Sequence, residues 1–405
     1  MNTNTILALA LTVGAASVTQ AADFDLGAHM KDAFKVFDAK RDNAENPYLQ
    51  ELSIKMRGQY QWGYLDPAGG DDRVKGNRND NNEWRRFRLG IQAKVLNQFT
   101  LKGIWNIGGL DARNKFNDGE WHRSQTEGSL DELTISATWD PVTVTLGKHK
   151  PAYMAEYRTS SAKLLTLERS MLVNQLKAEK LYGISVSNSD KKAEWGWNAG
   201  LWVNGQRDNT WLEPSFNGAD NITLGMSVSR ATGCNGRIQF DYMHSFHKDG
   251  ETNEGSEYAG PGAQDVIALS WEGKQEKLSI LAEAIAGFNV YGGAPGAENV
   301  YGLVLMPSYR FTPNWEGVIR YQLASGGNAV KSDSRYYTTN STYSGTSDCL
   351  QGLYIGANYY VCPSNPHMLK LMVGAEYLNS GGSDTKGNKG FTGWQFSSAI
   401  RFDFY

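Results

Sequence analysis

The sequence predicts an all-β protein, a transmembrane antiparallel β-barrel of about sixteen strands, and three observations support this. From Leu49 onward, apolar and polar residues alternate with the period of a strand that has two different faces. Short turns alternate with long loops rich in Gly, Asn, Asp and Ser, as in barrels with short turns on one side of a membrane and long loops on the other. Apolar residues are only 40% and mean hydropathy is −0.49, which excludes a bundle of membrane-spanning helices.

Soluble β-sandwiches and propellers also have regularly spaced strands, so they are the alternatives. No blade-length repeat recurs in this chain, and the apolar face continues through nearly every strand. In hydrocarbon every backbone N–H and C=O must be paired, so a membrane sheet has to close. The last strand, which ends on Tyr405, should therefore pair with the first.

The first 48 residues differ from the rest. Ile6 to Val18 is an apolar run too short to span a bilayer, and Thr19-Gln20-Ala21 ends in a small residue. We therefore expect a signal peptide at 1–21, although no Lys or Arg precedes the run; a buried N-terminal helix is the alternative. Residues 22–48 carry apolar residues at helical spacing, which predicts a short amphipathic helix in a periplasmic extension. The barrel would occupy 49–405.

The period-two segments give sixteen strands in order. The first is LSIKMRGQYQWGYL, which puts Ile54 and Tyr60 on one face and Lys55 and Arg57 on the other. The hairpin around Asp140-Pro141 is the clearest pair. The expected strands cover 52–65, 84–96, 99–107, 130–139, 142–149, 180–188, 194–204, 221–230, 237–247, 264–272, 277–288, 299–311, 315–324, 351–361, 367–378 and 391–405.

Other classes of function find little support. A formal charge of −3 argues against a nucleic-acid binder. No Gly-x-Ser-x-Gly or His-Glu-x-x-His motif is present, and nothing in the sequence positions Glu156 and Glu168 as a catalytic pair. Cys234, Cys349 and Cys362 lack metal-binding spacing. We therefore expect no enzyme, cofactor or metal, while a barrel enzyme and an adhesive or structural barrel remain the alternatives from other classes.

A long segment without strand period follows the central hairpin. It contains Gly147-Lys148-His149-Lys150-Pro151, then Thr159-Ser160-Ser161-Ala162-Lys163, then Glu168-Arg169-Ser170. These pieces resemble the corresponding segment of the phosphate-selective porin O/P family. The hairpin LYIGANYYVCPSNPHMLKLMVGAEYL also resembles the family's penultimate hairpin.

The resemblance implies a sixteen-stranded porin, usually a homotrimer, with a long third loop folded into the pore as a constriction. His149 and Ala152 depart from the family pattern, and the family's phosphate-binding lysines have no motif here, which leaves phosphate specificity open. The implied location is the bacterial outer membrane. The implied partners are outer-membrane lipid and lipopolysaccharide, small anions or other small solutes, and the outer-membrane insertion machinery, which would read the C-terminal strand ending in Tyr405.

If the apolar faces meet lipid, the polar faces line the lumen, where cations outnumber acids and should favour anions. The basic lumen candidates are Lys55, Arg57, Arg86, Arg88, Lys94, Lys102, Arg237, Arg310, Arg320, Lys370 and Arg401. The constriction candidates are Arg158, Lys163, Arg169, Lys150, Tyr153 and Tyr157. The expected function is passive diffusion of small hydrophilic solutes with a modest preference for anions, phosphate among them. A non-selective or sugar-passing porin is the alternative.

Overall fold

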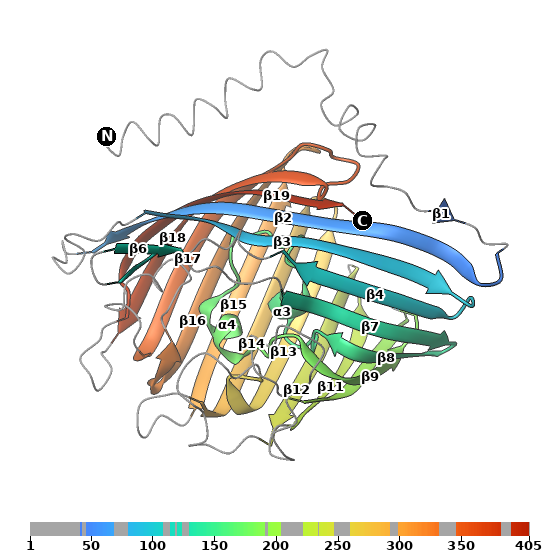
Figure 1. Ribbon diagram of the computed structural model, residues 1–405. Coiled ribbons are helices and arrows are strands. Elements are labelled where there is room, and N and C mark those ends of the chain that lie inside the picture. Colours follow the sequence, from blue (N-terminus) through green and yellow to red (C-terminus); the bar gives the residue numbers. More distant parts are fainter. Residues whose placement is uncertain are drawn as a thin grey trace, which may run out of the picture.

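The computed structural model is a closed antiparallel barrel of sixteen strands, which confirms the predicted fold class (Figure 1). It describes residues 41–42, 46–68, 80–107, 114–117, 120–123, 129–190, 193–203, 222–233, 235–246, 260–291, 299–331, 346–381 and 390–404. The barrel strands are β2 Leu49–Pro67, β3 Asp80–Val95, β4 Phe99–Asn106, β7 Ser129–Trp139, β8 Val142–His149, β9 Leu181–Asn188, β10 Trp195–Val203, β11 Ile222–Thr232, β12 Gly236–Ser245, β13 Ala263–Gln275, β14 Leu278–Val290, β15 Asn299–Arg310, β16 Trp315–Lys331, β17 Thr346–Tyr360, β18 Leu369–Gly381 and β19 Gly393–Phe404.

The sheet closes where the last strand pairs with the first. The β19–β2 register runs from Gly393 opposite Pro67 to Phe404 opposite Met56. On the outer face of this seam the Phe402 ring lies 6.3 Å from Phe87 and 5.4 Å from Phe404 between ring centroids. Gly58 lies opposite Phe402, and a Cβ there would run into the Phe402 ring, so only glycine leaves space for this packing.

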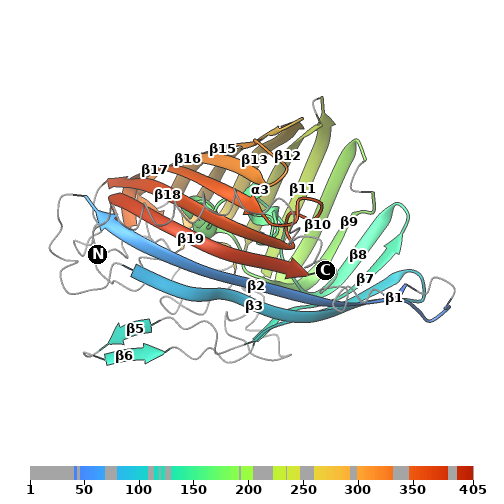
Figure 2. The same cartoon turned by 90° about the horizontal axis from the view of Figure 1, so that it is seen from above.

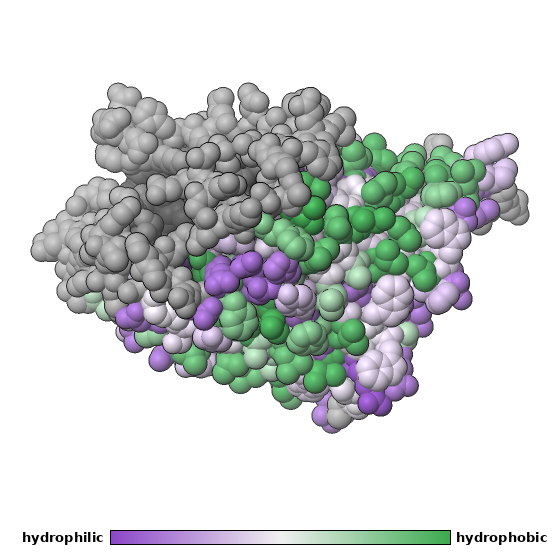
Figure 3. Space-filling model, turned by 90° about the horizontal axis from the view of Figure 1, so that it is seen from below, coloured by the Kyte–Doolittle hydropathy of each residue, from purple (hydrophilic) through white to green (hydrophobic). Residues whose placement is uncertain are grey.

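The outer face is apolar because alternate residues of each strand point away from the lumen. Mid-strand aliphatic side chains such as Leu303 and Ile355 remain 52% and 55% exposed. Figure 3 shows hydrophobic and pale, weakly polar side chains spread over one outer face. Exposed aromatic residues, including Trp139, Trp195 and Phe311, lie at strand ends, as expected for interfacial girdles.

Some strands are longer than the alternation predicts. Strand β16 continues to Lys331 and β17 begins at Thr346, and their register shifts between Ser325 and Val330. Residues 325–331 read SGGNAVK, so they contain no clean alternation that would have indicated a strand. Backbone pairing extends the sheet here, and Ala329 and Val330 are buried in a cluster of apolar side chains.

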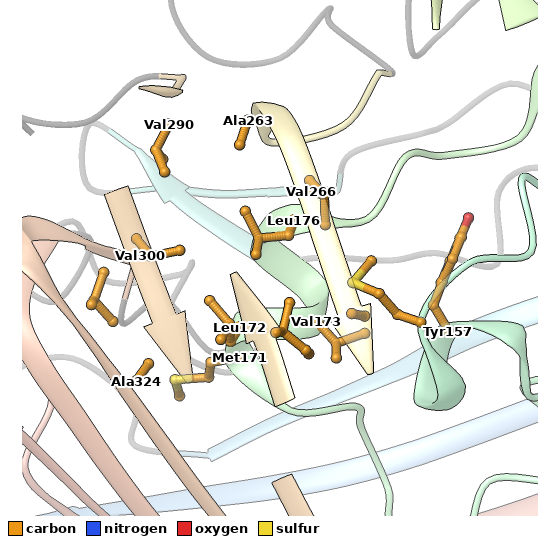
Figure 4. Close-up of a cluster of buried hydrophobic side chains, with 14 of the residues drawn as sticks. Tyr157, Met171, Leu172, Val173, Leu176, Ala263, Val266, Val290, Val300 and Ala324 are labelled. Carbon is orange, nitrogen blue, oxygen red and sulfur yellow. The ribbon is translucent and has the colours of Figure 1, made fainter. Parts of the chain in front are cut away.

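The segment between β8 and β9 lies within the ring of strands, as Figure 1 shows for its two short helices and Figure 2 for the first of them. These helices are α3 Ala155–Arg158 and α4 Met171–Leu176. Leu172, Val173 and Leu176 of α4 pack in a buried cluster with Val266, Val300 and other wall residues (Figure 4). Apolar burial therefore fixes α4 against the inner wall.

Other described elements lie outside the barrel sheet proper. Strand β1 (Arg41–Asp42) pairs with β2, and β5 (Asn114–Asn117) pairs with β6 (Glu120–Arg123) as a separate hairpin. The predicted signal peptide, almost all of the 22–48 extension with its helix, and the terminal Tyr405 lie outside the described residues. Within the described part, no helix has the length and apolar character needed to cross a membrane. Cys349 and Cys362 are free thiols.

Candidate functional site

We call the segment 150–180 the inner loop. Near its start, two acidic side chains of the barrel wall accept hydrogen bonds from its backbone N–H groups. Met154 N donates to Asp241 Oδ2 at 3.0 Å, and Ala155 N donates to Glu283 Oε1 at 2.5 Å. The first N–H groups of a helix lack partners within the helix. The two wall carboxylates satisfy those of α3 and fix its start against β12 and β14.

Arg320 of β16 is the central contact between the wall and the inner loop. Its guanidinium donates to Glu156 Oε1 at 3.3 Å, to Glu168 O at 2.7 Å and to Glu376 Oε1 at 2.9 Å. Its side chain is 2% exposed and that of Glu156 is fully buried. Removal of one partner would leave the other charges buried and uncompensated.

Three more predicted lumen cations also donate to the inner loop. Lys370 Nζ donates to Leu164 O at 2.6 Å, and the Arg401 guanidinium donates to Ser161 O and Leu167 O. Arg57 pairs with Asp403 at 2.7 Å and reaches Ser161 Oγ at 3.2 Å. We call Arg57, Arg320, Lys370 and Arg401 the anchoring wall, because their polar groups hold the loop in place.

The expected constriction residues have different environments. Arg158 forms ion pairs with Asp241 at 3.2 Å and Glu272 at 2.5 Å. Tyr153 is 1% exposed and its hydroxyl donates to Asn198 Oδ1 at 3.0 Å, so it fixes the loop to β10. Lys163 is exposed, and among the described residues nothing forms a hydrogen bond or ion pair with its ammonium.

Three basic side chains surround the ring of Tyr157. Lys150 Nζ lies 4.8 Å, Arg169 Cζ 5.3 Å and Lys177 Nζ 5.5 Å from its centroid. Lys150 also donates to the carbonyls of Tyr157, Arg158 and Thr159, at the end of α3. Burial first, then repulsion by Arg169, lowers the pKa of Lys150 to about 6. Lys150 therefore loses its charge more readily than an exposed lysine does.

A second group of cations lies on β3 and its neighbours. Arg88 pairs with Asp131 at 2.7 Å, Lys102 pairs with Glu132 at 2.6 Å, and Arg86 donates to Gln59 Oε1 at 2.8 Å. Lys180, at the end of the inner loop, pairs with Asp131 and with Glu132. We call Arg85, Arg86, Arg88, Lys102 and Lys180 the basic wall.

The alternation of the sequence assigns two residues here to the wrong face of the sheet, because β-bulges reverse the side on which they lie. They are Arg85 of the basic wall and Asp131, its acidic neighbour. The β2–β3 register shifts between Gln59 and Tyr60, so Arg85 points inward and reaches Glu168 at 2.8 Å. A second shift beside Ile104 brings Asp131 to the inner side, where it is 8% exposed. A bulge reverses the side of a residue without any local composition signal.

The remaining predicted cations belong to neither of these two groups. Lys94 is exposed near the short-turn end of β3, and Arg237 donates to Ser229 Oγ at 2.8 Å. Lys55 is partly buried on β2, while Arg310 stacks over the Tyr360 ring at 4.2 Å. Within the described chain no three His, Cys, Asp or Glu side chains gather as a metal site.

Comparison with solved structures shows the same fold at low sequence identity. Salmonella typhi OmpF, solved in complex with daunomycin, has a TM-score of 0.60 and 12% identity over 87% of this chain and 98% of its own. The anion-selective porin from Comamonas acidovorans has a TM-score of 0.52 and 11% identity over 87% and 99%. The trimer form of Vibrio cholerae OmpT has a TM-score of 0.51 and 9% identity over 87% and 98%.

Comparison with sequence families is more specific. No curated protein matches the chain. Residues 54–222, which include most of the first barrel strand, the next six strands and the whole inner loop, match the model of the family "Phosphate-selective porin O and P". This confirms the resemblance found in the sequence. This part of the chain is similar to that family, and the protein is a porin of the bacterial outer membrane.

Proposed function

We propose that this porin passes small hydrophilic solutes passively, that it prefers anions, and that the inner loop forms its constriction. The basic wall would face the permeating ion, while the anchoring wall holds the loop across the lumen. The observation that carries the anion preference is Arg86. It lies between two arginines that have carboxylate partners, yet no carboxylate pairs with Arg86 itself in the described part of the chain.

The chemistry of that group suits a small oxyanion. A guanidinium offers a planar set of donors that can bind phosphate or carboxylate through two parallel hydrogen bonds. Arg86 uses one terminal nitrogen for Gln59. In confined water the nearby charges of Arg85, Arg88 and Arg169 add Coulomb attraction for an anion.

A non-selective or sugar-passing porin is the second candidate, and the anchoring wall favours it. Arg320, Lys370 and Arg401 donate to loop backbone or buried carboxylates, so they add little attraction for a passing ion. The family match supports a channel rather than an enzyme.

We also propose the signal peptide at 1–21, the extension at 22–48, a homotrimer, contact with lipopolysaccharide and recognition of the C-terminal strand by the insertion machinery.

The test is the reversal potential of the purified protein in a planar bilayer under a KCl gradient, repeated with added phosphate. A potential on the chloride side supports the proposal, and block by millimolar phosphate would add a phosphate site. A potential near zero or on the potassium side leaves the second candidate. Absence of channels, followed by hydrolysis of lipid or peptide substrates, would overturn both in favour of an enzyme.

A further inference from the structure

Three polar side chains form a cluster on the outer face of the barrel, where β12 and β13 approach the long loops. The Tyr242 hydroxyl donates to Asp265 Oδ1 at 2.7 Å, and His244 Nδ1 donates to the same oxygen at 2.8 Å. His244 and Asp265 are direct cross-strand partners. Phe240 and Leu269, on the same face of these strands, are 45% and 49% exposed, so this face points away from the lumen. We call Tyr242, His244 and Asp265 the outer polar cluster.

The depth of the outer polar cluster matches the outer membrane surface. Asp265 is the third residue of β13, and His244 is the ninth of the ten residues of β12. At about 3.3 Å per residue and a tilt of about 40°, Asp265 lies about 5 Å below the long-loop end of its strand. Long loops lie on the outer side of such barrels. The cluster therefore faces the border between hydrocarbon and the headgroups of the outer leaflet.

The outer polar cluster does not use all of its hydrogen-bonding atoms. Within the described chain no hydrogen bond reaches Asp265 Oδ2 or His244 Nε2, and the two side chains are 27% and 23% exposed. A carboxylate oxygen can only accept, and one without a donor is unfavourable at the edge of hydrocarbon. The membrane component next to this cluster should therefore supply a donor.

Aromatic rings flank the outer polar cluster on both sides. The Phe246 ring lies edge-on to the His244 ring, 4.6 Å between centroids. Phe288 is the cross-strand partner of Asp265 on β14, and its ring lies 5.9 Å from that of Tyr301. Phe246 and Tyr301 are 45% and 48% exposed. An aromatic ring offers a flat apolar surface beside polar groups, which suits a sugar ring with one C–H side and hydroxyls at its edge.

We infer that the outer polar cluster binds the amino-sugar headgroup of an outer-leaflet glycolipid, with Asp265 Oδ2 accepting from a sugar hydroxyl or amide N–H. The inference rests on the proposed contact with lipopolysaccharide and adds the place and the groups that make it. A phosphate beside Asp265 would be repelled by the carboxylate, so the uncharged part of the sugar meets it. An ammonium headgroup can also donate, but it has no flat ring to pack on the flanking aromatic side chains.

The experiment measures lipid binding to the purified barrel in a detergent without sugar, by native mass spectrometry. The probes are lipid A, which is the amino-sugar lipid of lipopolysaccharide, phosphatidylethanolamine and phosphatidylglycerol. Asp265→Ala removes the acceptor. Asp66→Ala is the matched control, because Asp66 lies opposite the outward Trp394 near the long-loop end of β2. We expect the unmodified chain to prefer lipid A, Asp265→Ala to lose about tenfold in affinity for it, and Asp66→Ala to lose nothing.

His244→Phe separates the contact from general disruption of the strands. The variant keeps a ring against Phe246 and removes the donor that orients the carboxylate, so it should bind lipid A less tightly while heat-modifiable mobility shows a folded barrel. Equal affinity of Asp265→Ala and the unmodified chain, or an equal loss in Asp66→Ala, would overturn the site. Equal binding of the three lipids would overturn the sugar as its ligand. Single-channel conductance of the same samples reports separately on the proposed pore.

Discussion

Two neighbouring groups of lumen cations, the anchoring wall and the basic wall, use their charges differently. In the anchoring wall Arg320, Lys370 and Arg401 are at most 2% exposed, and they donate to the inner loop or to a buried carboxylate. In the basic wall Arg88 and Lys102 are 16% and 26% exposed at their side chains, and both pair with acids of β7. The number of charged residues in a pore lining therefore does not measure the attraction for a passing ion. Cations that are buried in contacts with the loop add little to that attraction.

Arg320→Met should have the largest effect, because it leaves Glu156 and Glu376 buried without their cation. We expect a loss of about 3–5 kcal/mol in the free energy of unfolding, as for other broken buried ion pairs. The inner loop should loosen, which would raise single-channel conductance and its variance. Thermal unfolding in detergent and single-channel recording measure both. Unchanged stability and conductance would show that Arg320 does not hold the loop.

Lys370→Met sharpens the comparison within the anchoring wall. The variant loses one buried hydrogen bond, to Leu164 O. We expect a loss of about 1–3 kcal/mol in unfolding free energy, since a buried acceptor loses its donor. The reversal potential under a KCl gradient should stay the same, because this ammonium is fully buried. A clear shift of that potential toward potassium would instead place Lys370 in contact with the ion path.

Arg86→Gln should have the opposite effect to Lys370→Met. It should change ion selectivity and leave the stability of the fold nearly unchanged. A unit charge about 6 Å from an ion in water contributes about 0.7 kcal/mol, so the chloride-to-potassium permeability ratio should fall about threefold. The unfolding temperature should change little. Lys94→Gln, near the short-turn end of the same strand, is the matched control and should shift the ratio less. Equal effects of both variants would remove any special role for Arg86.

Acidification should give the smallest change and should act through Lys150. Its pKa of about 6 means that it is neutral at pH 8 and charged at pH 5. The anion preference should therefore rise as the pH falls through about 6. Since an unfolded lysine binds its proton up to about pH 10, the folded chain binds fewer protons between about 6 and 10, and stability should rise with pH in that window.

Lys150→Met provides the control for this pH dependence. In the variant the rise in anion preference between pH 8 and pH 5 should be absent, while the preference at pH 8 should match that of the unmodified chain. The measurement is the reversal potential of both proteins, the unmodified chain and Lys150→Met, at pH 8 and at pH 5. Persistence of the full pH effect in Lys150→Met would assign it to another group.

The sequence by itself determined the barrel. The alternation that places Ile54 outside and Arg57 inside repeats through the strands, and hydrocarbon then forces the sheet to close, since every backbone polar group needs a partner. The family segment around Lys150 and Arg169 was likewise readable, because it is local. These features depend on neighbours a few residues apart, which a sequence displays directly.

Only the tertiary structure decided which charges remain for an ion. Arg320 meets Glu156 across 164 positions and Lys370 meets Leu164 across 206, and no local pattern encodes such pairs. Bulges turned Arg85 and Asp131 inward against the alternation. The physical reason is that strand period fixes a face only within an unbroken register, while burial of a charge depends on distant groups that folding brings together.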